Sequence, residues 1–517
     1  MQHGDIRYAI LGSRGGALAV YNLSGSTDTE TIPSTKLLQH CHAKESITAL
    51  QWQPITTSNE TSGYIFSTGR DGTLAIHQLT LQSSSPSFYL IHQLPLPFGP
   101  NIEGLTFTKN DELHVRGFKG KNFVSHDLTA QQDIFTVKCG GGVHRNWAFE
   151  PSDDGGTFIW TQNGSLMRVT QEERPLSTIR DGSHGREIKA VAVSDGQHQI
   201  IATGAEDTDI KLSTYSCSNG FECLQTLRKH NTGIQHLQWS ANGCRLFSSA
   251  GSEEFYVWRV CHGVPVLGVG VVCESPHPRS MMSDLRIMGF EAREKQEGGF
   301  DIVMAYSDST VKLWSYDCGE WVLLRSGDYL TACLTDVMFV KSAKDQPSDC
   351  RRLLTAAMDG HAGMWQCLED EILTWLQRRK VHQNAILDSS ASALSDGSTL
   401  LLTAGDDNGL GLSRIDPENN ISTLLIPRAH AAAVTALAVS KYGDDCFYIL
   451  SASIDQRVKL WDVRVDVAVP GVKGLQVRKV QNVFTSVADV SSMALLQLED
   501  GSTGVLVCGV GMDVWRF

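Results

Sequence analysis

The chain has 517 residues, of which 41% are hydrophobic and 20% are charged, and its mean hydropathy of -0.14 excludes the disordered and membrane-embedded classes. A net charge of -13 and a pI near 5.7 oppose binding of phosphate backbones over the whole surface, so any nucleic-acid contact requires a local basic patch. The 13 cysteines include no Cys-x-x-Cys pair, which argues against a zinc site and favours free thiols in a reducing, cytoplasmic compartment.

Segments of the form apolar strand, turn, apolar strand recur from the beginning of the chain, about every 49 residues. Weak copies begin at Tyr8, Leu113 and Gly156. The strongest early copy, YIFSTGRDGTLAIHQL from Tyr64, carries Asp71 in its turn and is preceded by His42. Because short strands alternate with turn residues at a regular spacing, the pattern predicts an all-β protein built of repeats.

The copy that begins at Leu113 contains a small basic cluster, Arg116, Lys119 and Lys121, on a predicted hairpin. Phe118 and Phe123 are interleaved with these cations, and cations with aromatic rings are typical of an RNA-binding patch. The same lysines are also typical of a solvated turn. The sequence leaves both interpretations open.

A run of three glycines, Gly140 to Gly142, precedes His144 and Arg145. An arginine that projects from such a tight loop can bind a phosphate with both guanidinium nitrogens. The alternative is structural, with Arg145 bonded to a neighbouring repeat and His144 in a buried slot. No helical segment follows the glycines, so they do not predict a cofactor-binding loop, and we expect no bound cofactor.

A polar stretch from Glu172 to Ser183, which contains Pro175, separates two groups of repeats. We therefore predict two domains, residues 1–178 with about four units and residues 179–517 with seven units. The first group begins in the middle of a unit, which suggests the C-terminal part of a longer protein or an irregular closure.

The second group repeats the same turn and strand positions. Its turn position holds Asp207, Asp308, Asp359, Asp407 and Asp455. Its strand-end position holds Trp258, Trp314, Trp365, Trp461 and, in the last copy, Trp515. A histidine precedes several of the turns, namely His184, His230, His382 and His430.

Histidine, serine and aspartate are also the residues of an acyl-transfer triad, but a triad occurs once in an active site. Here the set recurs in five units, so we interpret it as a buried hydrogen-bonded network within each unit. His430, Ser451 or Ser453, Asp455 and Trp461 form the most complete set. We therefore expect a protein without catalytic residues or a metal site.

Arg186, in the segment HGREI, precedes a strand of the second group and is a further candidate for partner or RNA contact. Its alternative role is an ion pair with Glu187 or another carboxylate nearby. Trp461, Asp462 and Arg464 also fit a W-D-x-R box that resembles substrate receptors of cullin-type ubiquitin ligases. That box is short, so a ligase adaptor or a general protein-interaction scaffold remains an alternative function.

The repeat resembles the WD repeat, which implies a β-propeller with seven blades in residues 179–517 and a partial propeller before it. Several segments also resemble the C-terminal half of the WD repeat-containing protein six family: VKCGGGVHRNWAF, HGREIKAVAV, ATGAEDTDIKL, RKHNTGIQHLQWS, LLTAGDDNGLGLS and VCGVGMDVWRF. This resemblance implies a non-catalytic scaffold that binds an FtsJ-like 2′-O-ribose methyltransferase. Its expected role is to position tRNA for methylation of the wobble nucleotide in the anticodon loop.

Overall fold

The structure is a computed structural model of the chain. It describes residues 2–3, 6–24, 31–55, 61–81, 86–142, 146–175, 184–196, 199–280, 284–296, 298–340, 352–367 and 372–517. The chain divides into two compact units. Unit 1 comprises Met1–Asp181 with Val260–Val272, and unit 2 comprises Gly182–Arg259 with Cys273–Phe517. The predicted boundary at 178/179 falls within residues 176–183, which lie outside the described residues.

Unit 1 contains four groups of consecutive antiparallel strands, the second of which also pairs in parallel through Gln93 with Val272. The first is β1 (Gln2–His3), β2 (Ile6–Gly12), β3 (Leu18–Asn22) and β4 (Ser34–Leu38). The second is β5 (Ile47–Ile55), β6 (Thr61–Gly69), β7 (Thr73–Leu81) and β8 (Ser87–Pro95). The third is β9 (Asn101–Phe107), β10 (Leu113–Lys119), β11 (Asn122–Asp127) and β12 (Gln132–Lys138), and the fourth is β13 (Trp147–Ser152), β14 (Gly155–Gln162) and β15 (Ser165–Gln171).

Unit 2 contains seven further groups of consecutive antiparallel strands. The first three are β16 (Ile188–Val193), β17 (Ile201–Ala205), β18 (Ile210–Ser216) and β19 (Gly220–Leu227); β20 (Ile234–Trp239), β21 (Arg245–Ala250), β22 (Phe255–Val264) and β23 (Gly268–Pro276); and β24 (Ile287–Glu294), β25 (Phe300–Tyr306), β26 (Thr310–Asp317) and β27 (Glu320–Asp328). The next two are β28 (Leu334–Phe339), β29 (Arg352–Ala357), β30 (His361–Cys367) and β31 (Leu373–Lys380); and β32 (Ile386–Ala393), β33 (Thr399–Gly405), β34 (Leu410–Ile415) and β35 (Ile421–Ile426). The last two are β36 (Val434–Gly443), β37 (Cys446–Ser453), β38 (Arg457–Val465) and β39 (Leu475–Phe484), with the short 3-10 helix η1 (Gly471–Gly474) before β39; and β40 (Ala488–Gln497) and β41 (Thr503–Arg516).

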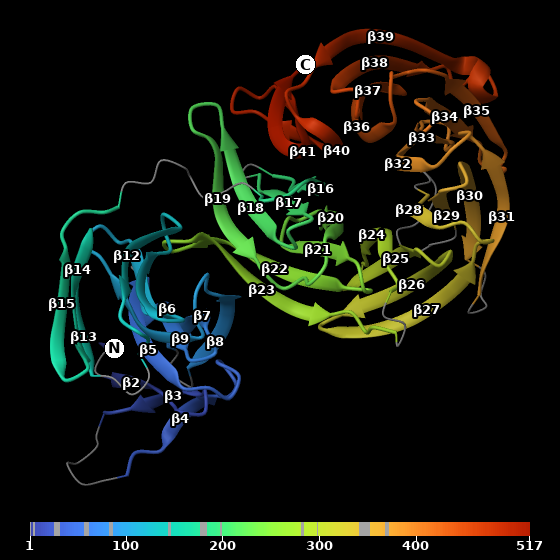
Figure 1. The fold of residues 1–517 in the computed structure, drawn as a ribbon. Coiled ribbons are helices and arrows are strands. Elements are labelled where there is room, and N and C mark those ends of the chain that lie inside the picture. The colour runs from blue at the N-terminus through green and yellow to red at the C-terminus, as the bar shows by residue number, and fades with distance from the viewer. Residues whose placement is uncertain are drawn as a thin grey trace. The chain divides into compact units, whose positions relative to one another are not determined.

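The seven groups of unit 2 are the blades of a closed propeller, which Figure 1 shows as a ring from β16 in green to β41 in red. The first strands of the blades contact one another in the order β16, β20, β24, β28, β32, β36 and β40, and β40 returns to β16. Apolar side chains fill the space between blades; one such core joins Ile188 and Ile201 to Leu496, Leu506 and Cys508. The predicted all-β WD-repeat propeller fold is confirmed.

Hydrogen bonds from side chains to neighbouring first strands accompany this packing at all seven junctions between blades. They are Trp239 to Ala192 O, Gln238 with Ala292 N and O, Phe339 N to Glu291, Ser389 Oγ to Asp336, Leu437 N to Asp388, Thr435 to Val490 O, and Ser491 to Ile188 O. A backbone group at a blade interface thereby gains a partner that its own sheet does not provide.

Unit 1 includes the tip of the β22–β23 hairpin, residues 260–272. Val264 and Leu267 of this tip belong to the same apolar core as Phe66 and Ile91. The backbone N–H of Val271 donates to His92 Nδ1 at 3.2 Å, and burial lowers the pKa of His92 to about 3, which keeps this ring neutral and able to accept. The tip is therefore an integral part of the core of unit 1.

Candidate functional site

The histidine, serine, aspartate and tryptophan at the β36–β39 blade form one continuous hydrogen-bonded chain. His430 Nδ1 lies 3.2 Å from Asp455 Oδ1, His430 Nε2 lies 2.8 Å from Ser451 Oγ, and Trp461 Nε1 donates to the same Oγ at 2.9 Å. Burial lowers the pKa of His430. A neutral ring with its proton on Nδ1 can donate to Asp455 and accept the Ser451 hydroxyl proton, so every polar atom of the chain has a partner.

The β20–β23 blade builds the same chain with a glutamate in place of the aspartate. His230 bonds to Ser248 at 2.8 Å and to Glu254 at 3.1 Å, and Trp258 donates to Ser248 at 2.9 Å. Burial alone would raise the pKa of Glu254, but hydrogen bonds from His230 and Asn231 outweigh it and lower the pKa to about 2. The sequence alignment of repeats places Ser252 in the turn position and gives no indication that Glu254 supplies the carboxylate.

Three further blades contain the hydrogen bonds of the histidine to a carboxylate and to a hydroxyl, but no tryptophan of the described segments bonds that hydroxyl. These are His42 with Ser67 and Asp71, His184 with Thr203 and Asp207, and His382 with Thr403 and Asp407. In each, one ring nitrogen faces the carboxylate and the other faces a hydroxyl on the second strand of the blade.

Each turn aspartate also shapes its own hairpin. Its carboxylate accepts the backbone N–H two residues later, at 3.0–3.1 Å, in the turns of Asp71, Asp207, Asp308, Asp359, Asp407 and Asp455. The residue between has a positive φ, for example 56° at Gln456 and 65° at Asn408. An aspartate therefore stabilises a turn that only glycine adopts without strain.

Two blades depart from the predicted network. Asp308 is exposed, and within the described part of the chain its hydrogen bonds stay in its own turn, with Thr310. Asp359 accepts the hydroxyl of Tyr329 at 3.1 Å where other blades place a histidine, while Trp365 keeps its bond to Thr355 at 2.9 Å.

Two of the predicted strand-end tryptophans also lack the network bond. Trp314 Nε1 and Trp515 Nε1 have no hydrogen-bond partner among the described residues. The Trp314 ring instead lies edge-on to His277, with the ring centroids 4.5 Å apart. The position of a tryptophan in the repeat therefore does not guarantee the bond.

The basic cluster of unit 1 is divided between a core and a turn. Phe118 and Phe123 are 2% and 0% exposed and belong to an aromatic core, so neither ring can stack on a base. Arg116 is half-buried against the Phe149 ring, whereas Lys119 and Lys121 are exposed in the β10–β11 hairpin. His144 and Arg145 lie outside the described residues.

Arg186 is exposed at the rim of a cavity of about 750 Å³ that is also lined by Lys189, Glu206 and Arg286. Glu187 pairs with Lys189, at 2.7 Å, rather than with Arg186, and Glu206 lies 3.6 Å from the same lysine. The alternative role of Arg186, an ion pair with Glu187 or another carboxylate, has no counterpart among the ion pairs of the described residues. The cavity mixes both signs of charge and does not by itself select an anionic ligand.

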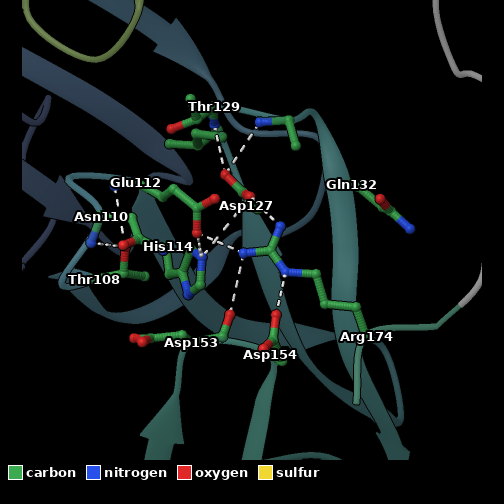
Figure 2. A network of polar contacts seen from close by, with 12 residues as sticks. Thr108, Asn110, Glu112, His114, Asp127, Thr129, Gln132, Asp153, Asp154 and Arg174 are labelled. Atoms are coloured by element: carbon green, nitrogen blue, oxygen red, sulfur yellow. Dashed lines mark hydrogen bonds and ion pairs between the residues drawn. The ribbon is translucent and has the colours of Figure 1, made fainter.

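One cluster in unit 1 has the residue types of a metal site. Glu112, His114 and Asp127 each offer a ligand atom, and these atoms lie within 4.8 Å of one another. Figure 2 shows the Arg174 guanidinium directed at this cluster, 3.0 Å from Asp127 and 2.5 Å from Glu112, with a third bond of 2.9 Å to Asp154. The guanidinium supplies the positive charge that the carboxylates require, and it ties the segment after β15 to the β9–β12 sheet. The sequence gives no signal of this cluster.

Comparisons with known proteins place these observations in a family context. The WD domain, G-beta repeat family matches residues 221–259 and 421–462. The tRNA (34-2'-O)-methyltransferase regulator WDR6 of Pongo abelii is 30% identical over 85% of this chain and 46% of its own length, and the Homo sapiens protein is 29% identical over 87% and 47%. The COMPASS component SWD3 of Saccharomyces cerevisiae is 24% identical over 50% of this chain. The chain thus spans about half the length of the WDR6 relatives. Among the described residues, no helix is long and apolar enough to cross a membrane.

Proposed function

Because the chain is a WD-repeat homologue of the WDR6 proteins over 85% of its length, we propose that it is a non-catalytic regulator of a tRNA 2′-O-ribose methyltransferase. The methyltransferase would be an FtsJ-like enzyme that supplies S-adenosylmethionine chemistry. This chain would hold enzyme and tRNA together and orient the ribose of the wobble nucleotide.

The state of the histidine–aspartate pairs supports a role without catalysis. In five blades both ring nitrogens are already bonded, and the five histidines are buried in their own blades. A general base must reach a substrate proton directly or through one water. These side chains instead fix the hairpins of a rigid surface on which a partner can bind.

Free thiols support a cytoplasmic location for this function. None of the cysteines among the described residues forms a disulfide, and Cys217 and Cys318 are exposed. Exposed free thiols persist in a reducing compartment, where tRNA and its modifying enzymes are found together.

The test is reconstitution of wobble-ribose methylation. An FtsJ-like methyltransferase, tRNA and labelled S-adenosylmethionine are incubated with and without the chain, and the methylated nucleoside is measured by mass spectrometry. We expect the chain to raise the rate and to co-purify with the enzyme. An unchanged rate when this protein is added would exclude the proposal, and capture of a cullin adaptor instead would favour the ubiquitin-ligase alternative.

A further inference from the structure

The outermost strands of the sixth blade of unit 2, β38 and β39, carry a group of cations on one face of the sheet. Cross-strand partners lie on the same side of a sheet, and here Arg457 is opposite Phe484 and Lys459 is opposite Asn482. Beyond a bulge between Leu460 and Trp461, Lys479 is opposite Trp461 and joins the same face. We call Arg457, Lys459, Lys479, Asn482 and Phe484 the β38–β39 patch.

The other face of the same strands is committed to the core. Val458 and Leu460 are buried in the apolar cluster that packs against β40 and β41, and Val483 lies against it. On the patch's own face Trp461 is buried in the neighbouring core. The patch residues themselves are more accessible: Arg457, Lys479 and Asn482 are exposed, Lys459 is half-buried, and the Phe484 side chain is 57% exposed. More than half of the Phe484 side chain is therefore available for contact with a ligand.

The cations of this patch lack acidic partners. None of Arg457, Lys459 and Lys479 has a carboxylate within 4.0 Å among the residues that the structure describes, although the chain as a whole is acidic. The Lys459 ammonium instead donates a hydrogen bond to the carbonyl oxygen of Ala429 at 2.5 Å. Asp455, whose charge acts on Lys459, is already bonded to His430 and to backbone N–H groups.

The register of β38 and β39 brings these cations onto neighbouring positions, where they repel one another. Burial lowers the pKa of Lys459, and the positive charges of Lys479 and Arg457 lower it further against the attraction of Asp455. Like charges held together without counter-ions are unfavourable until an anion binds.

We propose that the β38–β39 patch binds single-stranded RNA, with phosphates on Arg457 and Lys479 and a base stacked on Phe484. A row of cations beside an exposed aromatic ring is the combination that single-stranded nucleic acid requires, because the cations follow the backbone and the ring accepts any base. An acidic protein could also pair with the cations, but the exposed ring beside them favours RNA, because every base offers a face that can stack on it. This inference rests on the proposed function and adds to it a contact with the unpaired anticodon loop.

The test is binding of a fluorescein-labelled anticodon stem-loop RNA to the full chain, measured by anisotropy over a series of KCl concentrations. The double variant Arg457→Gln, Lys479→Gln should weaken binding and reduce the slope of log K against log salt by about 1.4, since each single-strand phosphate contact contributes about 0.7. Phe484→Ala should weaken binding roughly tenfold with little change in slope.

The matched control removes two charges from the same strands. Arg464 and Arg478 both pair with Asp462 at 3.3 Å, so Arg464→Gln, Arg478→Gln should leave RNA binding unchanged. Equal losses in both double variants, or no loss with Phe484→Ala, would refute the patch. A loss of methyltransferase binding with unchanged RNA binding would identify a protein interface and also refute it. Failure of methylation in the reconstitution assay would overturn the proposed function but not a measured patch-dependent RNA affinity.

Discussion

The hydroxyl of Ser451 has two buried partners, so its removal should be one of the most damaging single-atom changes in unit 2. Ser451→Ala leaves Trp461 Nε1 without an acceptor and His430 Nε2 without a donor, and all three side chains are buried. Each buried polar group left without a hydrogen-bond partner lowers the free energy of unfolding by about 1–3 kcal/mol. With two such groups, we expect Ser451→Ala to lower it by about 4 kcal/mol.

Two other blades provide internal controls, because each contains half of this arrangement. Among the residues with described positions, the Thr403 hydroxyl bonds His382 but no tryptophan, and the Thr355 hydroxyl bonds Trp365 but no histidine, both at 2.9 Å. Thr403→Val and Thr355→Val should therefore each cost about 2 kcal/mol.

The measurement is urea unfolding of the full chain followed by circular dichroism. All three sites lie in unit 2, so a departure from two-state behaviour affects them alike. If Ser451→Ala lowers the free energy of unfolding by no more than either threonine variant does, the two hydrogen bonds of Ser451 do not add, and the prediction is refuted.

Three further predictions follow from charged groups. Arg174→Gln should destabilise unit 1 by about 2–4 kcal/mol in thermal unfolding, because it leaves the buried Asp127 carboxylate without its ion-pair partner. Arg168→Gln, on the exposed strand β15, should have little effect. Equal effects of the two variants would contradict a stabilising role for the Arg174 ion pairs. Hydrogen bonds hold the pKa of Glu254 at about 2 in the folded state against 4.5 in the unfolded state. The stability that Glu254 contributes is therefore complete above pH 4.5 and is lost as the pH falls toward 2. In urea unfolding at several pH values, Glu254→Gln should lose less stability than the wild type on acidification, and an equal loss of stability would exclude Glu254 as its source. Burial raises the pKa of Asp388 to about 7 and that of the nearby Asp336 to about 6. The free energy of unfolding should therefore fall as the pH rises from about 4 to 7. In the same titration Asp388→Asn should reduce this fall in stability, and an unchanged dependence on pH would contradict the prediction.

The blades and their turns are predictable because the same pattern of residues recurs in each repeat. The turn aspartates are recognisable from spacing alone, and in the structure all six make the same bond to the backbone two residues later. A single deviation is harder to see: Glu254 performs the role of an aspartate from a shifted position, and Tyr329 stands where a histidine is expected.

The sites that depend on distant contacts are not predictable from one sequence. Arg174 lies in a stretch that reads as a polar linker, yet its partner Glu112 is 62 residues away. Phe118 and Phe123 read as surface aromatics between cations, but the sheet directs both into the core. The β38–β39 patch emerges only from cross-strand register, since Arg457 and Phe484 are separated by the whole of a loop and a 3-10 helix.

The junction between β40 and β16 has a consequence for synthesis of the protein. The Ser491 hydroxyl bonds to Ile188 O, 303 positions earlier in the chain. At about 5–20 residues per second, a ribosome needs roughly 15–60 s to make the residues in between. During that time β16 has no β40 to pack against. Newly made chains are therefore at risk of aggregation and should depend on chaperones until the final blade has been synthesised.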